Sequence, residues 1–235
     1  MIFAAGKFNP GQLIDNFVQM ARDDNEKHEE NAAVKFTHGD GWGLAYLKGK
    51  DLKIYRSTKA VYQDPQLEQF KTLQTRLLLL HARKGSRGVL KLENIHPFEL
   101  KKNDQQWIFF HNGTVRDELK IDPEIQLRGE TDSEKFFYYL LSGRNAKITS
   151  SQLREKLQKL TNFSGANFIL SNGAITFLCN WYTLNPLYYT MKILQQKESV
   201  LVSSEILPHY RQAAWRYLDN QSLFSVRTDD VSIES

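Results

Sequence analysis

Two stretches of the sequence, Leu77–Leu80 and Trp107–Phe110, consist of apolar residues without interruption. A strand that packs on one face alternates apolar and polar residues, whereas an unbroken apolar run is typical of a strand covered on both faces. Both runs are far too short to cross a bilayer. We therefore expect buried strands over residues 76–82 and 107–110, with other parts of the chain packed on either side of them.

Helix starts are marked by capping residues at four places. Asn9-Pro10 and Asp64-Pro65 each combine an N-cap residue with proline at the first helical position. Thr131–Glu134 and Thr149–Gln152 fit the capping box, in which the first and fourth side chains bond each other's backbone N–H groups. The sequence predicts helices over 10–21, 65–73, 131–141 and 149–160, and further strands over 2–5, 44–47, 52–55, 167–170, 175–179, 187–191 and 200–203.

The connections between these elements predict the fold class. Lys48–Asp51 and Asn172-Gly173 are expected hairpin turns, and the acidic residues 22–30 are expected to form a solvated loop. Helices in two groups between runs of strands predict an α+β fold, with two antiparallel sheets packed face to face and helices outside. With 235 residues, 41% hydrophobic and 25% charged, the chain is expected to form a single domain over residues 1–235.

Several classes of function are disfavoured by composition. Cys179 is the only cysteine, so no internal disulfide and no cysteine-based metal site can form within one chain. The first residues lack the apolar segment of a signal peptide, and we expect a cytoplasmic protein without a membrane span. The basic residues behind the net charge of +4 are dispersed, which argues against nucleic-acid binding.

Three histidines follow or end apolar segments: His81, His96 and His111. Their spacing does not match a metal-binding pair, so we expect structural histidines with satisfied hydrogen bonds. No metal and no cofactor is therefore predicted.

Four polar or glycine positions near the ends of the predicted strands and at a helix start are candidates for a substrate site. Arg83 offers a planar set of donors that suits a carboxylate, and Asp132 in the first turn of a helix suits an ammonium group. Asn112 and the backbone N–H of Gly113 can form an oxyanion hole, which favours acyl transfer or amide hydrolysis. The alternatives are that Arg83 and Asp132 pair with each other, and that Asn112-Gly113 is an ordinary turn.

A series of short motifs resembles that of the class II glutamine amidotransferases, whose glutaminase domain is an N-terminal-nucleophile hydrolase. The motifs are, in order, Gly41-Trp42-Gly43, His81-Ala82-Arg83, Glu93-Asn94-Ile95-His96-Pro97, His111-Asn112-Gly113, Gly129-Glu130-Thr131-Asp132 and Ser203-Ser204-Glu205. Each motif alone is unspecific, but six in the family's order cover nearly the whole chain. The likeness is to the small stand-alone members, without a synthase domain.

The resemblance implies a four-layer αββα sandwich and assigns roles by position. Arg83 and Asp132 match the residues that bind the carboxylate and amino groups of glutamine, and Asn112 and Gly113 match the oxyanion hole. Ser86 matches a small hydroxyl residue that helps to hold the substrate. The next position, where the family often has histidine, is Arg87 here, so the chain departs from the family's pattern at that contact.

The chain departs from the family at its start. Members begin with a cysteine whose thiol attacks the glutamine amide and whose α-amino group acts as the base, whereas this sequence opens with Met1. Cys179 lies in a predicted strand late in the chain and is expected to be a buried structural residue. As the sequence stands, the nucleophile is absent and the chain is expected to be inactive.

Two hypotheses account for this departure. In the first, the native chain starts upstream with the cysteine and hydrolyses glutamine to glutamate and ammonia for an unknown acceptor, with a synthase or acceptor protein as partner. In the second, the chain is an inactive relative that acts as an amino-acid-binding or protein-interaction module, with glutamine or a related small amino compound as its ligand.

Overall fold

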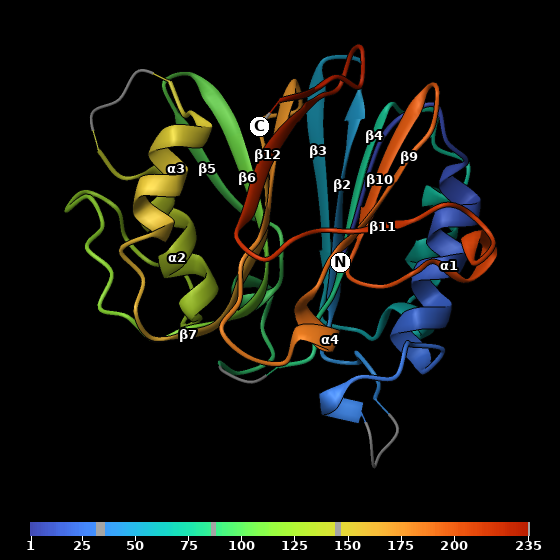
Figure 1. Cartoon of the computed structure of the whole chain (residues 1–235), viewed down its shortest axis with the longest axis horizontal. Coiled ribbons are helices and arrows are strands. Elements are labelled where there is room, and N and C mark those ends of the chain that lie inside the picture. Colours follow the sequence, from blue (N-terminus) through green and yellow to red (C-terminus); the bar gives the residue numbers. More distant parts are fainter. Residues whose placement is uncertain (32–35, 86–87, 144–146, 235) are drawn as a thin grey trace.

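The computed structural model describes residues 1–31, 36–85, 88–143 and 147–234. Within these residues, two antiparallel sheets lie face to face, with α2 (Asp132–Leu141) and α3 (Ser150–Leu157) outside one sheet and α1 (Pro10–Arg22) outside the other (Figure 1). The expected α+β fold with four αββα layers is confirmed.

Both sheets combine strands from distant parts of the sequence. In spatial order, one sheet contains β11 (Arg216–Tyr217), β9 (Lys192–Gln195), β10 (Ser199–Ser203), β1 (Ile2–Gly6), β4 (Leu77–Ala82), β2 (Trp42–Lys48) and β3 (Asp51–Ser57). The other contains β13 (Ile233–Glu234), β12 (Ser222–Arg227), β8 (Ile175–Asn180), β7 (Phe163–Ser171), β6 (Gln105–Val115) and β5 (Phe98–Lys102). Short helical turns are α4 (Pro186–Tyr189), η1 (Glu29–Asn31), η2 (Val61–Gln63), η3 (Pro65–Phe70), η4 (Leu92–Asn94) and η5 (Pro208–Tyr210).

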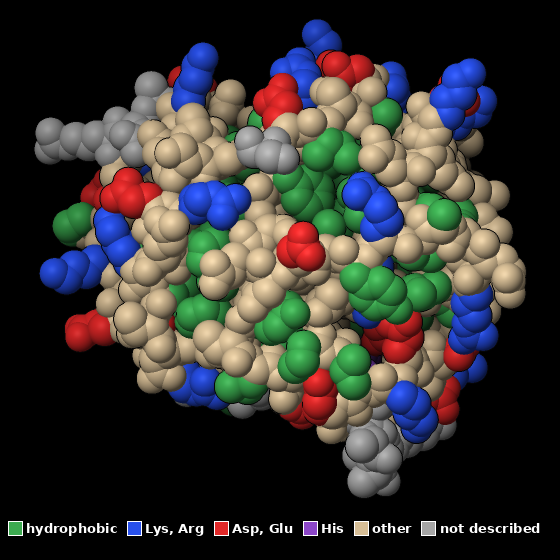
Figure 2. Space-filling view, in the orientation of Figure 1, with side chains coloured by type: hydrophobic (Ala, Val, Ile, Leu, Met, Phe, Trp, Pro, Cys, Tyr) green, Lys and Arg blue, Asp and Glu red, His purple; other side chains and the backbone are tan. Residues whose placement is uncertain are grey.

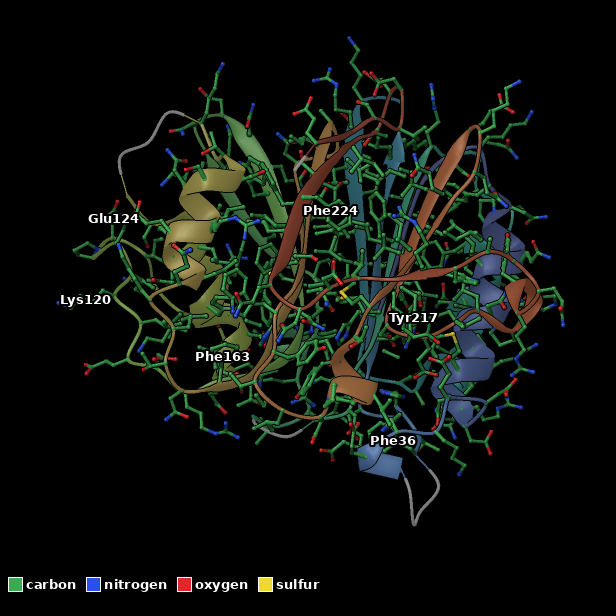
Figure 3. The ribbon with its side chains drawn as sticks, in the orientation of Figure 1. Phe36, Lys120, Glu124, Phe163, Tyr217 and Phe224 are labelled. Carbon is green, nitrogen blue, oxygen red and sulfur yellow. The ribbon has the colours of Figure 1, made fainter. Side chains whose placement is uncertain are left out.

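Alternation along the buried strands distributes side chains among three hydrophobic clusters. On β4, Leu77 and Leu79 pack between the two sheets, whereas Leu78 and Leu80 pack toward α1. The side chains of β6 alternate in the same way. Phe110 lies between the sheets, whereas Phe109, the residue before it, faces α2. Among the side chains labelled in Figure 3, Phe224 belongs to the cluster between the sheets and Phe163 to the cluster beneath α2. The unbroken apolar runs therefore reflect coverage on both faces.

Most predicted element starts are confirmed. Asn9 accepts a hydrogen bond from the backbone of Gln12 at the start of α1, and Thr149 forms the full capping box with Gln152. Asn172-Gly173 joins β7 to β8 as a hairpin. At the start of α2, only one of the two hydrogen bonds of the expected capping box forms. The Thr131 side chain accepts from the backbone N–H of Glu134, but the Glu134 carboxylate accepts from the loop before the helix and not from the backbone of Thr131.

Two predictions were wrong in secondary structure. The strand expected over 187–191 is replaced by α4, which begins after Asn185 at a φ of 51°. The helix expected over 65–73 is a 3₁₀ helix that ends at Phe70. Strands β5 and β9 and the strands of the last twenty residues were not predicted from the sequence.

Among the described residues, no helix has both the length and the apolar content that a membrane crossing needs. On the face shown in Figure 2, Lys and Arg side chains are dispersed among Asp and Glu side chains.

Candidate functional site

A cavity of about 350 Å³ lies where strand ends from both sheets meet the start of α2. Four of the five candidate residues line it: Arg83, Asn112, Gly113 and Asp132. The fifth, Ser86, lies outside the described residues, as does Arg87. Residues that are far apart in the sequence are therefore brought to one cavity, as the motif series implies.

Arg83 follows β4 and is held by the glycine-rich loop before β2. The backbone N–H of Arg83 donates to the Gly41 carbonyl at 2.8 Å, and the backbone N–H of Asp40 donates to the Arg83 carbonyl at 3.0 Å. The guanidinium lies over Gly85, where an added Cβ would be 2.4 Å from Nη1. Burial lowers the pKa of Arg83, and nearby Asp40 acts in the opposite direction. Arginine nevertheless remains a cation at neutral pH, so the cavity contains a fixed positive charge.

Asn112 and Gly113 lie within β6, which continues to Val115 rather than ending at them. Gly113 has a φ of +146°, and a Cβ there would be 1.9 Å from the Gly165 carbonyl oxygen on β7. Only glycine allows this close approach of the two strands. The ladder is irregular between Gly113 and Val115. This irregularity at the cavity wall is typical of bulges beside functional sites.

Asp132 is the first residue of α2, and its orientation is fixed from β6. Its Oδ2 accepts a hydrogen bond from the backbone N–H of Val115 at 2.8 Å. The next residue, Ser133, bonds Nδ1 of His111 through its hydroxyl at 2.8 Å. A carboxylate at the start of a helix is favoured by the helix dipole, so this position holds a negative charge facing the cavity.

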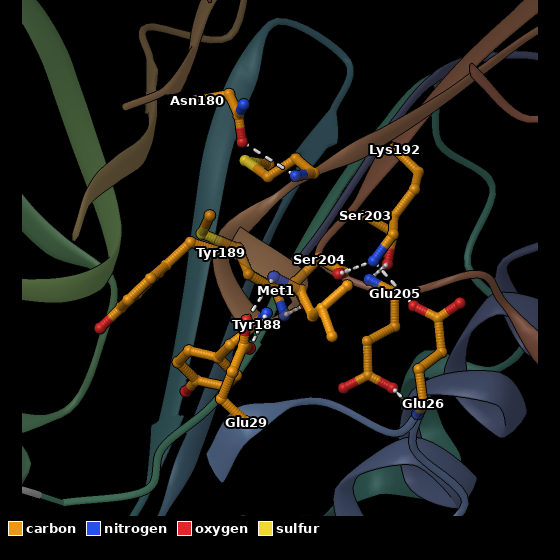
Figure 4. Close-up of polar contacts among 12 residues, drawn as sticks. Met1, Glu26, Glu29, Asn180, Tyr188, Tyr189, Lys192, Ser203, Ser204 and Glu205 are labelled. Atoms are coloured by element: carbon orange, nitrogen blue, oxygen red, sulfur yellow. Dashed lines mark hydrogen bonds and ion pairs between the residues drawn. The ribbon is translucent and has the colours of Figure 1, made fainter. Parts of the chain in front are cut away.

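The amino end of β1 reaches the same cavity, and Figure 4 shows the contacts around it. The Met1 amino group donates to Ser204 Oγ at 3.1 Å, while Lys192 Nζ donates to the Ser204 carbonyl at 2.9 Å and to Glu26 Oε2 at 2.7 Å. The Glu205 carboxylate accepts from the Glu26 N–H at 2.8 Å. Burial lowers the pKa of the amino group to about 6 and raises the pKa of Glu205 to about 7.

The outer wall of the cavity comes from two segments that contact each other. The Glu29 carboxylate accepts hydrogen bonds from the backbone N–H groups of Leu187 and Tyr188, at 3.0 Å each. These bonds fasten η1 to α4, and Tyr188 and Tyr189 line the cavity. The prediction that residues 22–30 are simply a solvated loop was therefore wrong, because Glu26 and Glu29 make specific contacts at the site.

The three histidines line the same cavity, and the ring centroids of His81 and His96 are 4.2 Å apart. His111 is hydrogen-bonded through both ring nitrogens, as expected, and His81 Nε2 lies 3.1 Å from the His111 carbonyl. His81 and His96 depart from this expectation, because Nδ1 of His81 and both ring nitrogens of His96 are buried without a hydrogen-bond partner in the described chain. Burial holds the pKa values of His81 and His96 well below the usual value, so both rings are neutral. Over the described residues, His, Cys, Asp and Glu side chains form no cluster of three suited to a metal ion.

Sequence reasoning missed part of the site. Ser204 and Glu205 stood in the motif series without a role, and Glu26 and Lys192 carried no signal. Lys192 lies in β9, just beyond the strand that was expected over 187–191, and its partner Glu26 is 166 positions away. A half-buried ion pair of this separation is visible only in three dimensions.

Comparison with known proteins identifies the family. The family model for class-II glutamine amidotransferases matches residues 27–202. A Haemophilus influenzae protein named "Putative glutamine amidotransferase" is 32% identical over 159 residues, covering 63% of this chain and 54% of the relative. Escherichia coli YafJ, with the same description, is 27% identical over 192 residues, covering 73% of this chain and 74% of YafJ. The chain thus spans about half the length of the first relative.

Solved structures share the fold at low sequence identity. A predicted glutamine amidotransferase from Pseudomonas aeruginosa superposes with a TM-score of 0.58 at 17% identity, covering 82% of this chain and 86% of that protein. Glutamine phosphoribosylpyrophosphate amidotransferase from Bacillus subtilis gives a TM-score of 0.66 at 14% identity, covering 99% of this chain and 48% of that one. The fold is similar to that of N-terminal-nucleophile glutamine amidotransferase domains. The chain belongs to the class-II glutamine amidotransferase family.

Proposed function

We propose that this protein binds glutamine and, with a cysteine at the amino end of β1, hydrolyses its side-chain amide to glutamate and ammonia. The observation that carries the proposal is that one cavity is lined by all four described candidate residues and by the amino end of the chain. The four residues are Arg83, Asp132, Asn112 and Gly113, and Met1 lies just before β1. Arg83 takes the α-carboxylate and Asp132 the α-ammonium group, so that opposite charges meet in a partly desolvated cavity.

The chemistry follows from the remaining groups of the site. The cysteine thiolate attacks the amide carbon, the developing oxyanion accepts hydrogen bonds from the Asn112 side chain and the Gly113 N–H, and ammonia leaves. Water then cleaves the thioester to release glutamate. An α-amino group at the place of the Met1 nitrogen, with its pKa about 6, is mostly unprotonated at neutral pH. It can take the thiol proton and then give it to the amide nitrogen, which leaves as ammonia.

Binding without hydrolysis is the second candidate. The observation in its favour is that Cys179, the one cysteine of the sequence, is fully buried on β8, and burial raises the pKa of its thiol well above the usual value. A thiol in that setting is inert. In this case the protein is an amino-acid-binding or protein-interaction module.

Ammonia release from engineered chains separates the two candidates. We would prepare the unaltered chain and a panel in which an N-terminal cysteine replaces Met1 or precedes it by one or two residues. At least one member of the panel should release glutamate and ammonia in equal amounts, and changing its cysteine to serine or Asn112 to Ala should abolish the release. If every member binds glutamine but none hydrolyses it, the binding module is the correct function.

A further inference from the structure

Asn94 occupies a position from which it joins the two loops that carry the charged residues of the site. It is fully buried, lines the cavity and ends the short η4 turn. Its Nδ2 donates to the Val89 carbonyl at 2.9 Å, and its Oδ1 accepts from the Glu130 N–H at 2.9 Å. One side chain therefore bonds the loop that follows Arg83 and the loop that precedes Asp132.

The two loops pack against this side chain so closely that only glycine fits at the contact points. A Cβ on Gly88 would lie 2.8 Å from Asn94 Nδ2, and a Cβ on Gly129 would lie 2.4 Å from Asn94 Oδ1. Since neither position leaves room for a methyl group, the backbone of each loop lies directly against the amide group. The separation of the loops is thus set by the dimensions of the Asn94 amide group.

Each loop is also connected to one of the two charged residues, so the position of the loop affects the position of that residue. On one side, Arg83 Nη2 donates to the Gly88 carbonyl at 3.2 Å, so the guanidinium is tied to the residue beside Val89. On the other side, only Thr131 separates Glu130 from Asp132, and Thr131 caps the helix that Asp132 begins. An exposed ion pair between Lys91 and Glu130, at 2.9 Å, bridges the same two loops at the surface.

We propose that Asn94 is a positioning residue that sets the distance between the Arg83 guanidinium and the Asp132 carboxylate. The inference rests on the proposed function. An α-amino acid carries its carboxylate and ammonium groups on one carbon, so both are bound together only if the two protein charges stand at a matching distance. Asn94 therefore selects ligands with both groups, while contributing little to the binding of a ligand with only one.

Binding of three ligands by ligand-observed NMR tests this role. Glutamine has both head groups, glutaric acid monoamide lacks the ammonium group, and 4-aminobutanamide lacks the carboxylate. In Asn94→Asp the shape is kept, but an oxygen replaces the donor that faces the Val89 carbonyl. The dissociation constant for glutamine should rise at least tenfold, whereas those of the two truncated ligands should change less than twofold.

Two further variants keep the test decisive. Asn16→Asp is the matched control, because Asn16 is a buried asparagine on α1 that likewise donates to one backbone carbonyl and accepts from one backbone N–H, away from the cavity. It should leave all three dissociation constants unchanged. Lys91→Ala removes the exposed bridge without touching the core, and should weaken glutamine binding about threefold with no effect on the truncated ligands.

The possible failures are distinguishable. If the unaltered chain does not bind glutamine, the proposed function fails and the role of Asn94 fails with it. If the unaltered chain binds glutamine, the role of Asn94 alone is overturned by an equal loss for all three ligands in folded Asn94→Asp. It is also overturned if glutamine binding is unchanged in that variant, or if Asn94→Asp does not fold and Lys91→Ala has no effect.

Discussion

Glu134 provides a prediction whose magnitude follows from its contacts. Its carboxylate is almost fully buried and accepts hydrogen bonds from the backbone N–H groups of Arg128 and Gly129, at 2.8 and 2.7 Å, and from the Tyr138 hydroxyl at 3.2 Å. In Glu134→Gln, one backbone N–H loses its acceptor, which costs about 1–3 kcal/mol. The other backbone N–H now donates to a neutral amide oxygen in place of a charged carboxylate oxygen, and this weaker hydrogen bond costs about 1 kcal/mol of stability. Removal of a buried charge offsets part of this, and we expect a net loss of about 2 kcal/mol.

The assay is urea unfolding followed by tryptophan fluorescence, with the free energy of unfolding compared at equal m-values. The matched control is Glu155→Gln, in which an exposed carboxylate loses only its ion pair with Lys159, and no measurable loss of stability is expected. A loss below about 0.5 kcal/mol for Glu134→Gln would refute the reasoning, because the Arg128–Gly129 loop would then not depend on the carboxylate.

Three further predictions concern the cavity. Gly113→Ala places a methyl group 1.9 Å from the Gly165 carbonyl oxygen, so thermal unfolding should show a loss of at least about 3 kcal/mol, and a loss below about 1 kcal/mol would contradict the packing. Burial raises the pKa of Glu205 from 4.5 to about 7, so the folded state holds this proton more tightly and stability falls as pH rises between those values. The Glu205→Gln variant should not show this decline, and above pH 7 its free energy of unfolding should exceed that of the unaltered chain by up to roughly 3 kcal/mol. If urea unfolding shows that the stability of the variant falls with pH as it does in the unaltered chain, the prediction is contradicted. Asp132→Asn should weaken glutamine binding about tenfold to a hundredfold in calorimetry with the fold unchanged, and equal affinity would exclude Asp132 as the ammonium ligand.

Local physical chemistry explains which parts of the fold were predictable. The apolar runs in β4 and β6 had to be covered on both faces, and the caps at Asn9 and Thr149 satisfy backbone groups within a few residues. Patterns of this kind depend on neighbours in the sequence. The layers, the hairpins and the start of each main helix were therefore predictable without the structure.

The segment 186–189 shows why other parts were not. Its apolar and aromatic residues favour a strand, but the Glu29 carboxylate bonds the N–H groups of Leu187 and Tyr188 and thereby stabilises the start of a helical turn. Glu29 lies 158 positions from Leu187. A tertiary contact thus overrides the local preference.

The same distinction applies to the site. Arg83, Asn112 and Asp132 were predicted because they stand in motifs beside recognisable strand ends or helix starts, and the structure places all three at one cavity. Lys192 and Glu26 were not predicted, because an isolated lysine in a strand and a glutamate in an acidic stretch are usually solvated. Their ion pair forms, with Lys192 buried and Glu26 half-buried, only because two distant segments meet beside Ser204.

The central claim is that Arg83 and Asp132 bind the two charged groups of glutamine while Asn112 faces its amide. The most direct measurement is a crystal structure of the chain soaked with glutamine. We predict the α-carboxylate within hydrogen-bond distance of the Arg83 guanidinium, the ammonium group on the Asp132 carboxylate, and the side-chain amide oxygen directed at Asn112. Glutamine bound in the reverse orientation, or bound elsewhere with this cavity empty, would contradict the claim.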